Sequence, residues 1–103
     1  MDDITLSDNP EAHRFELRKN GVVAAYCEYN LLKGMLLFTH TEVLPQFEGQ
    51  GLGSKLAVFA LDEVRRRELN AVPACPFMAG YITKHPEWHD IVHETYKTKL
   101  GIR

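Results

Sequence analysis

Gly49-Gln50-Gly51-Leu52-Gly53-Ser54-Lys55 carries a glycine at every second position and joins an apolar run, 35–43, to a helical pattern, 53–69. Glycine lets backbone amides approach a ligand closely because it has no Cβ atom. A helix that starts after such a loop presents unpaired N–H groups and the positive end of its dipole. The stretch therefore predicts an anion site, most often for phosphate or pyrophosphate. The same spacing also fits a flexible turn that only joins a strand to a helix.

The first turn of this helix favours the anion site. It carries Ser54 and Lys55, and no acidic residue occurs before Asp62, although a helix that needs only internal stability usually places Asp or Glu there. Two well-known phosphate motifs do not fit. The nucleotide-triphosphatase loop needs a Gly-Lys-Ser/Thr end, which the chain lacks, and the dinucleotide fingerprint needs a third glycine where the chain has Leu56.

Length and composition indicate one domain spanning residues 1–103. The apolar fraction of 45% and the charged fraction of 25% are typical of a globular protein, and the net charge of −2 does not favour binding to nucleic acid. No apolar stretch approaches the roughly 20 residues that cross a bilayer, and the acidic N-terminus lacks a signal-peptide core, so we expect a cytoplasmic protein. Cys27 and Cys75 have no metal-ligand spacing and would stay reduced there.

The segment 14–18 alternates between apolar and charged residues. Phe15 and Leu17 share one face and the charged side chains share the other, which predicts a half-exposed strand. Residues 1–12 show little periodicity, so we expect a loose start or a short edge there. The edge of the strand at 14–18 would then be exposed and could pair with another copy, so we expect a monomer or a weak homodimer.

Two further strands follow a hairpin turn at Asn20-Gly21. The first, 22–32, places Cys27 among its apolar positions, which makes Cys27 a small core residue. The second, 35–43, begins apolar on both faces, which predicts a central strand.

The second half of this central strand is polar. Alternation places His40 and Glu42 on one face and Thr39 and Thr41 on the other. Titratable groups at the carboxyl end of a central strand, next to an anion loop, are where the site of an α/β protein is expected. A strand end that runs out into solvent is the alternative interpretation.

The helical pattern after the glycine loop has an apolar stripe at spacings of three and four, so this helix packs on the sheet. The next strand, 71–75, is then parallel to the central strand through a right-handed crossover. Pro73 and Pro76 cannot donate to a ladder, so they loosen its pairing and leave a gap for an extended ligand. Cys75 lies between them, at the edge of this gap.

The remaining chain predicts a second helix, 77–84, whose aromatic and apolar side chains line the gap, and then a last helix or a poorly ordered tail, 88–100. His85, His89 and His93 recur every four residues, but a proline after the first of them interrupts the spacing. We therefore expect a polar helical face rather than a metal site.

At this point the residues resemble a known family. The strand end His-Thr-Glu-Val (40–43), the glycine loop, the sequence Cys-Pro-Phe (75–77) and a tyrosine four residues before His-Pro resemble the GNAT-type N-acetyltransferases over residues 13–95. The chain resembles more closely the compact single-domain subfamily, which lacks the first helices of full-size members. The resemblance implies a mixed α/β fold with a mostly antiparallel sheet, a central β-α-β unit and helices packed on the sheet.

The resemblance also implies acetyl-CoA or coenzyme A as co-substrate, and no metal. The family's loop places Arg or Gln ahead of two glycines, which are Gly51 and Gly53 here, but Glu48 stands at the Arg/Gln position. A carboxylate there removes a side-chain contribution and leaves the main-chain cradle. The family places the pantetheine arm along the central strand. The residues implied to bind acetyl-CoA are Thr41, Val43, Gly49, Gln50, Gly51, Leu52, Gly53 and Ser54.

The reaction implied by the resemblance is transfer of an acetyl group from the CoA thioester to an amine of a small molecule, peptide or protein. The amine must be neutral to attack, so Glu42 or His40 is the expected base. Cys75 is either a nucleophile that takes the acetyl group first or a thiol that lines the pocket. Tyr81 is either the acid that protonates the leaving sulfur or an aromatic of the cleft wall. Rival functions are a CoA-binding sensor without turnover and a small interaction domain.

Overall fold

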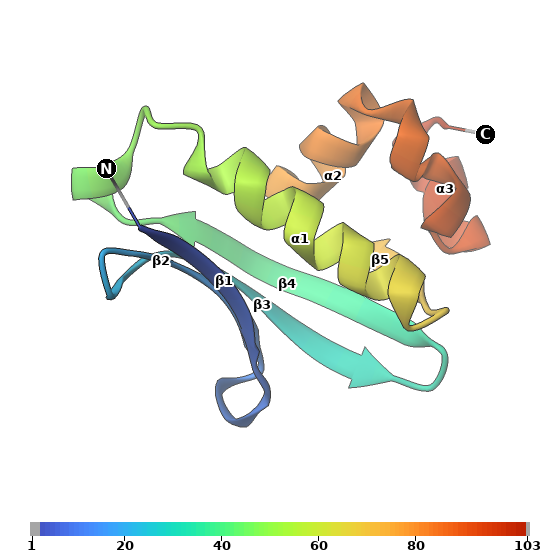
Figure 1. Cartoon of the computed structure of the whole chain (residues 1–103). Helices are drawn as coiled ribbons and strands as arrows, with labels where there is room; N and C mark the ends of the chain where they lie inside the picture. The colour runs from blue at the N-terminus through green and yellow to red at the C-terminus, as the bar shows by residue number, and fades with distance from the viewer. Residues whose placement is uncertain (1–2, 103) are drawn as a thin grey trace.

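The chain forms four consecutive strands, then one β-α-β crossover and two further helices (Figure 1). The structure, a computed structural model, describes residues 3–102. The strands are β1 Ile4–Asn9, β2 Arg14–Lys19, β3 Val22–Leu32, β4 Met35–Val43 and β5 Asn70–Pro73. The α-helices are α1 Leu52–Arg66, α2 Pro76–Lys84 and α3 Glu94–Leu100, and 3-10 segments cover Pro10–Ala12, Pro45–Phe47 and Pro86–Ile91.

The five strands lie side by side in chain order, and every neighbouring pair is antiparallel except β4 and β5. The parallel pair is joined through α1, because parallel strands need a crossover connection. The mixed, mostly antiparallel sheet with a central β-α-β unit is therefore confirmed.

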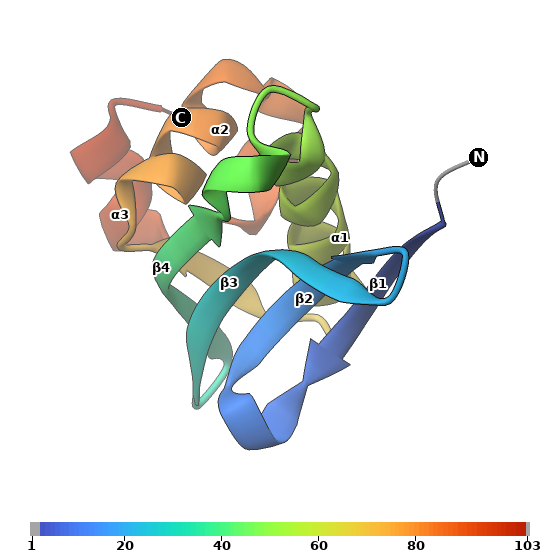
Figure 2. The same cartoon turned by 90° about the vertical axis from the view of Figure 1, so that its left-hand side faces the viewer.

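The helices gather on one side of the sheet, as Figures 1 and 2 show from two directions. The apolar stripe predicted for α1 is buried against the strands through Leu52, Leu56, Ala60 and Val64. Each fully buried side chain of the size of Leu or Val stabilises the fold by about 1.5–3 kcal/mol. No helix between residues 3 and 102 crosses the opposite face. We call it the open face, and its polar members include Thr5, Ser7 and Asn9 of β1 and Arg14, Glu16, Arg18, Tyr26, Glu28, His40 and Glu42 of the next three strands.

The residues expected as a loose start or a short edge form β1, the edge strand of the sheet. β1 pairs with β2 along its whole length. Ile4 and Leu6 pack against the core, and Asp8 accepts a hydrogen bond of 2.6 Å from the hydroxyl of Tyr29. The expectation of an exposed edge at 14–18 is therefore wrong, because β1 covers that edge. The first two residues lie outside the described range.

The central strand β4 loses one of its partners halfway along. Its parallel ladder with β5 ends where Phe38 lies opposite Pro73. Beyond that point the N–H of Cys75 donates to the carbonyl oxygen of Phe38 at 3.0 Å, and no described residue of β5 pairs with residues 39–43. The ladder thus stops at the first of the two prolines, as the sequence predicted.

A β-bulge sets the direction of the side chains in the second half of β4. Thr39 is an extra residue between Phe38, which stays in the core, and His40. After the bulge, Thr41 points toward the core and His40 and Glu42 lie on the open face. The predicted pairing of His40 with Glu42 on one face is confirmed.

The segment expected as one last helix or a tail is divided into three parts. It forms a 3-10 segment, then a bridge from Val92 to Ala71 that extends the sheet beside β5, and then α3. Trp88 and Ile91 are buried in the core. The segment therefore covers the outer edge of β5 rather than extending into solvent.

Candidate functional site

The glycine loop ends at the N-terminus of α1. Gly49 and Gly51 have φ angles of +80° and +74°, in the left-handed region that residues with a Cβ atom rarely adopt. Gly51 is the N-cap of α1, no side chain caps the helix, and its first turn holds no acid. The first N–H groups of α1 can therefore bind an anion.

A cavity of about 350 Å³ lies in front of this loop. A Cβ atom placed on Gly49 or Gly51 would meet no heavy atom within 4 Å, so both glycines face open space. Gln50, also predicted to bind the ligand, does not line this cavity, and its side chain accepts a hydrogen bond from Lys19 Nζ. The lining residues are Val43, Phe47, Glu48, Gly49, Gly51, Leu52, Gly53, Ser54 and Phe77.

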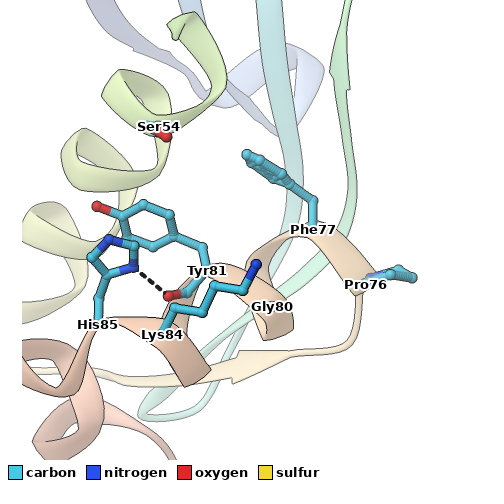
Figure 3. Close-up of a pocket in the computed structure, with 7 residues that line it drawn as sticks. All are labelled: Ser54, Pro76, Phe77, Gly80, Tyr81, Lys84 and His85. Carbon is cyan, nitrogen blue, oxygen red and sulfur yellow. Dashed lines mark hydrogen bonds between the residues drawn. The ribbon is translucent and has the colours of Figure 1, made fainter.

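A second cavity, of about 360 Å³, lies between the N-terminus of α1 and α2 (Figure 3). Ser54 and Phe77 line both cavities, so the two adjoin. Lys84 and His85 were not among the predicted site residues. Their spacings of three and four from Tyr81 could have indicated them, because residues at these spacings share one face of a helix. The lining residues are Ser54, Pro76, Phe77, Gly80, Tyr81, Lys84 and His85.

Tyr81 is held in the wall of the second cavity. Its ring stacks on His85 with 3.9 Å between ring centroids, and the Nδ1–H of His85 donates to the carbonyl oxygen of Tyr81 at 2.7 Å. Burial raises the pKa of Tyr81, the charge of Glu87 adds to this, and a hydrogen bond with Trp88 opposes it. The hydroxyl consequently stays protonated at neutral pH.

On the core side of β4, one hydroxyl contacts both cysteines. Thr41 Oγ1 lies 3.2 Å from Cys27 Sγ and 3.4 Å from Cys75 Sγ. Burial raises the pKa of the Cys27 thiol to about 12 and outweighs the hydrogen bond from Thr41. Cys75 is only 2% exposed, belongs to the core cluster and lines neither cavity.

On the open face, His40 Nε2 lies 3.0 Å from Glu42 Oε1, and the two side chains are 51% and 43% exposed. Tyr26 stands beside them, with 6.0 Å between its ring centroid and that of His40. Burial raises the pKa of Tyr26, and the charges of Glu42 and Glu28 add to this. The sheet therefore separates the two groups of predicted catalytic residues, with Cys75 on one side and the His40–Glu42 pair on the other.

The three regularly spaced histidines bond to the backbone instead of converging. The ring nitrogens of His85 and His89 lie 2.7 Å from carbonyl oxygens, and His93 caps α3. In the described part of the chain, no group of three or more His, Cys, Asp and Glu residues is arranged to hold a metal ion. Within the same part, no helix is long and apolar enough to cross a membrane.

A mixed five-stranded sheet, with a glycine loop at the start of the helix between its parallel strands, defines a GNAT-like fold. The sequence model of the family described as GCN5-related N-acetyl-transferase matches residues 14–91. The chain belongs to this N-acetyltransferase family. No curated protein matches the chain in sequence.

Two solved structures share the fold at 20% sequence identity. A GCN5-like protein from Staphylococcus aureus superimposes with a TM-score of 0.66 over 88% of this chain and 87% of its own. The ribosomal-protein-S18-alanine N-acetyltransferase from Escherichia coli gives 0.56 over 68% of this chain. The present chain spans only 63% of the length of that enzyme.

Proposed function

We propose that the chain binds acetyl-CoA and transfers its acetyl group to an amine. The observation that carries this proposal is the glycine loop at the start of α1, where Gly49 and Gly51 leave open space beside the first N–H groups of the helix. Pyrophosphate is a typical ligand of such a helix start. Membership of an N-acetyltransferase family supports the same acyl donor.

The residues present fit this donor along its length. The amides of residues 51–54 would hold the pyrophosphate, and the edge of β4 between Thr41 and Val43, which has no strand partner on β5, would pair with the pantetheine arm. Lys84 in the adjoining cavity offers a cation to a further phosphate. When bound, acetyl-CoA supplies an activated acetyl group as its thioester.

In a direct transfer, the open-face pair and Tyr81 would carry out the proton movements. The amine nitrogen attacks the thioester carbonyl, and the C–S bond breaks. Glu42, or His40 through its 3.0 Å contact with Glu42, would take the proton that the amine loses. Tyr81 would give a proton to the leaving sulfur, since its raised pKa keeps the hydroxyl protonated.

A covalent route through Cys75 is the second candidate mechanism. It requires a Cys75 thiolate to attack the same carbonyl before the amine does. The side chain is buried, contacts Thr41 and lines neither cavity. These observations favour direct transfer, with Cys75 as part of the wall behind Thr41.

A CoA-binding protein without turnover is the rival function, and the carboxylate of Glu48 lines the cavity of the proposed donor site. This carboxylate repels phosphate oxygens. Its replacement in Glu48→Gln is therefore expected to tighten CoA binding by about fivefold, or about 1 kcal/mol, as for an exposed charge pair.

Calorimetric titration with acetyl-CoA and with CoA tests the donor site. Gly51→Val is expected to abolish binding because its side chain would project into the cavity beside the first N–H groups of α1. Gly34→Val is the matched control, since Gly34 has a φ of +72° and lies in the turn between β3 and β4, so the backbone strain is similar and the cavity is untouched. Circular dichroism checks that both variants fold. Retained affinity in a folded Gly51→Val protein would exclude this site.

Release of CoA in the presence of a panel of amines tests turnover. Glu42→Gln is expected to lower the rate, whereas Cys75→Ala is expected to leave it nearly unchanged if transfer is direct. Intact mass after incubation with acetyl-CoA alone checks the covalent route. If the protein gains the mass of one acetyl group and Cys75→Ala abolishes this gain, the covalent route would replace direct transfer as the mechanism.

We further propose that residues 1–103 act as one domain in a reducing compartment such as the cytoplasm, because Cys27 and Cys75 are both free thiols. A monomer or a weak homodimer is expected, with the edge strand β1 as the surface for pairing. Light scattering over a range of protein concentrations would distinguish the two states.

A further inference from the structure

We propose that the open face binds the amine acceptor, and that this acceptor carries an anionic group within about two strand spacings of its reactive amine. The amine would lie at Glu42 and His40, and the anionic group at Arg14 and Arg18. The inference rests on the proposed acetyl transfer and adds the chemical class of the acceptor to it.

The strand register places the two ends of this site in line. Tyr26 of β3 lies opposite Glu16 of β2 on one side and opposite Glu42 of β4 on the other. These three residues form a row across the open face. Neighbouring strands lie about 4.8 Å apart, so the row spans about 10 Å of backbone from Glu16 to Glu42.

The cationic end is built on a buried carboxylate. Glu16 is only 2% exposed. It accepts hydrogen bonds from Arg14 Nε at 2.7 Å, from Arg18 Nη2 at 3.0 Å and from Asn9 Nδ2 at 3.0 Å. One negative charge thus fixes two guanidinium groups, so Arg14, Glu16 and Arg18 together carry one net positive charge, with Glu28 of β3 opposite Arg14.

The guanidinium of Arg14 is both fixed and accessible. Its Cζ atom lies 4.6 Å from the ring centroid of Tyr26, so it is directed along the row toward β4. Its side chain is 28% exposed. Within residues 3–102 its hydrogen bonds use Nε alone, and both terminal nitrogens can therefore donate to a carboxylate or a phosphate.

The other end of the row is anionic and reaches the broken ladder of β4. Glu42 points to the open face, and no Lys or Arg in the described range forms a salt bridge with it. Glu28 of β3 lies in the neighbouring row, opposite Arg14 on one side and His40 on the other. A protonated amine would bind there before it loses its proton to Glu42 or His40. This position adjoins the edge along which the pantetheine arm is proposed to lie.

Charge complementarity selects a dipolar acceptor over two other classes. A polyamine would meet Arg14 and Arg18 with like charge at its far end. The phosphates of a nucleic acid would meet Glu28 and Glu42, which carry the same sign of charge. Only a ligand with opposite charges at its two ends satisfies both ends of the row.

The test compares 8-aminooctanoate with its primary amide, 8-aminooctanamide, as acceptors. The two differ only in the anionic group, and their flexible chain can bridge separations of up to about 10 Å, the backbone span of the row. We expect kcat/KM for the acid to exceed that for the amide by about fivefold in the wild-type protein, as for a partly exposed charge pair. Arg14→Gln should abolish this preference and Arg14→Lys should retain part of it. Arg66→Gln is the control, since Arg66 is exposed on α1, on the other side of the sheet. Equal kcat/KM values for the two acceptors would overturn the proposal.

An NMR titration decides the same question without turnover. The amide signals of residues 14–18, 26 and 40–42 should shift with 8-aminooctanoate in the absence of CoA. The uncharged ligand 8-aminooctanamide should shift these signals only at higher concentration. Arg14→Gln should remove this difference between the two ligands. If these signals do not move, the acceptor site is wrong even where acetyl-CoA binds. If they move and no CoA is released with any amine, the acceptor site stands and the proposed acetyl transfer fails.

Discussion

The helix-covered face and the open face of the sheet bury their residues by different means, and β2 shows both. Phe15 and Leu17 point under the helices while Glu16, between them, points to the open face, and all three are buried. On the covered face, aromatic and aliphatic neighbours exclude water. On the open face, two arginines do so by lying over the carboxylate.

The two kinds of burial have different consequences. Apolar burial is non-directional and stabilises the fold roughly in proportion to the area removed from water. Burial of a carboxylate costs desolvation free energy, which its hydrogen bonds must offset, but it fixes the positions of its partners. We therefore expect the covered face to contribute most of the stability and the open face to position charges for a ligand.

The largest effect is expected on the covered face. Leu17→Ala removes a fully buried side chain from the core and should lower the free energy of unfolding by about 2–5 kcal/mol. Urea denaturation at neutral pH measures this loss. A loss below that of the open-face variant described next would contradict the assignment of stability to the covered face.

A smaller effect is expected from Glu16→Ala. The substitution leaves Arg14 and Arg18 without their carboxylate, but both arginines are partly exposed and can be hydrated, so we expect a loss of about 1–3 kcal/mol. The exposed Glu11→Ala serves as control and should change stability by no more than about 0.5 kcal/mol. Equal losses in the two variants would mean that Glu16 holds nothing in place.

Tyr29→Phe tests a polar contact at the margin of the covered face. Tyr29 is buried and donates to Asp8 at 2.6 Å, and burial, together with this hydrogen bond, raises its pKa to about 12. Loss of the hydroxyl should cost about 1 kcal/mol at neutral pH. Thermal denaturation should show the change. An unaltered melting temperature would show that the hydrogen bond from Arg67 is sufficient for Asp8.

The smallest effect is expected in the dependence of stability on acidic pH, which distinguishes the open face from the covered face. Burial raises the pKa of Glu16, but its hydrogen bonds with Arg14, Asn9 and Arg18 outweigh burial and lower it overall. A lowered folded-state pKa contributes stability above the unfolded value of about 4.3. This contribution is lost as the pH falls through the folded-state pKa. Glu16→Gln should therefore lose less stability than the wild-type protein between about pH 5 and pH 2. Parallel curves for the two proteins would contradict this origin.

Local signals in the sequence were sufficient for the covered face and the donor loop. The spacing of Leu52, Leu56, Ala60 and Val64 predicts the face of α1 that is buried, because helical geometry alone decides it. The end of the parallel ladder follows from Pro73, which cannot donate. The cavity in front of the glycines follows from their missing Cβ atoms.

Features that depend on pairing between strands could not be predicted. Alternation along β2 placed Glu16 on a half-exposed face, and its burial arises from neighbours on β1 and β2 that fold over it. β1 itself has only Ile4 and Leu6 as apolar markers among polar residues. The separation of Cys75 from Glu42 by the thickness of the sheet depends on where α2 begins in space, which no local pattern encodes.

Gly53 illustrates how two glycines of one motif can be required for unrelated reasons. Gly51 is held by its backbone angle, whereas a Cβ atom on Gly53 would lie 2.8 Å from Cζ of Phe77. The tolerance of Gly53 to substitution is therefore set by a ring on another helix. In a protein-engineering series, Gly53→Ala should require the ring of Phe77 to shift, and a smaller residue at 77 would remove that requirement. Replacement of Phe77 would also change both cavities, because its ring lines each of them.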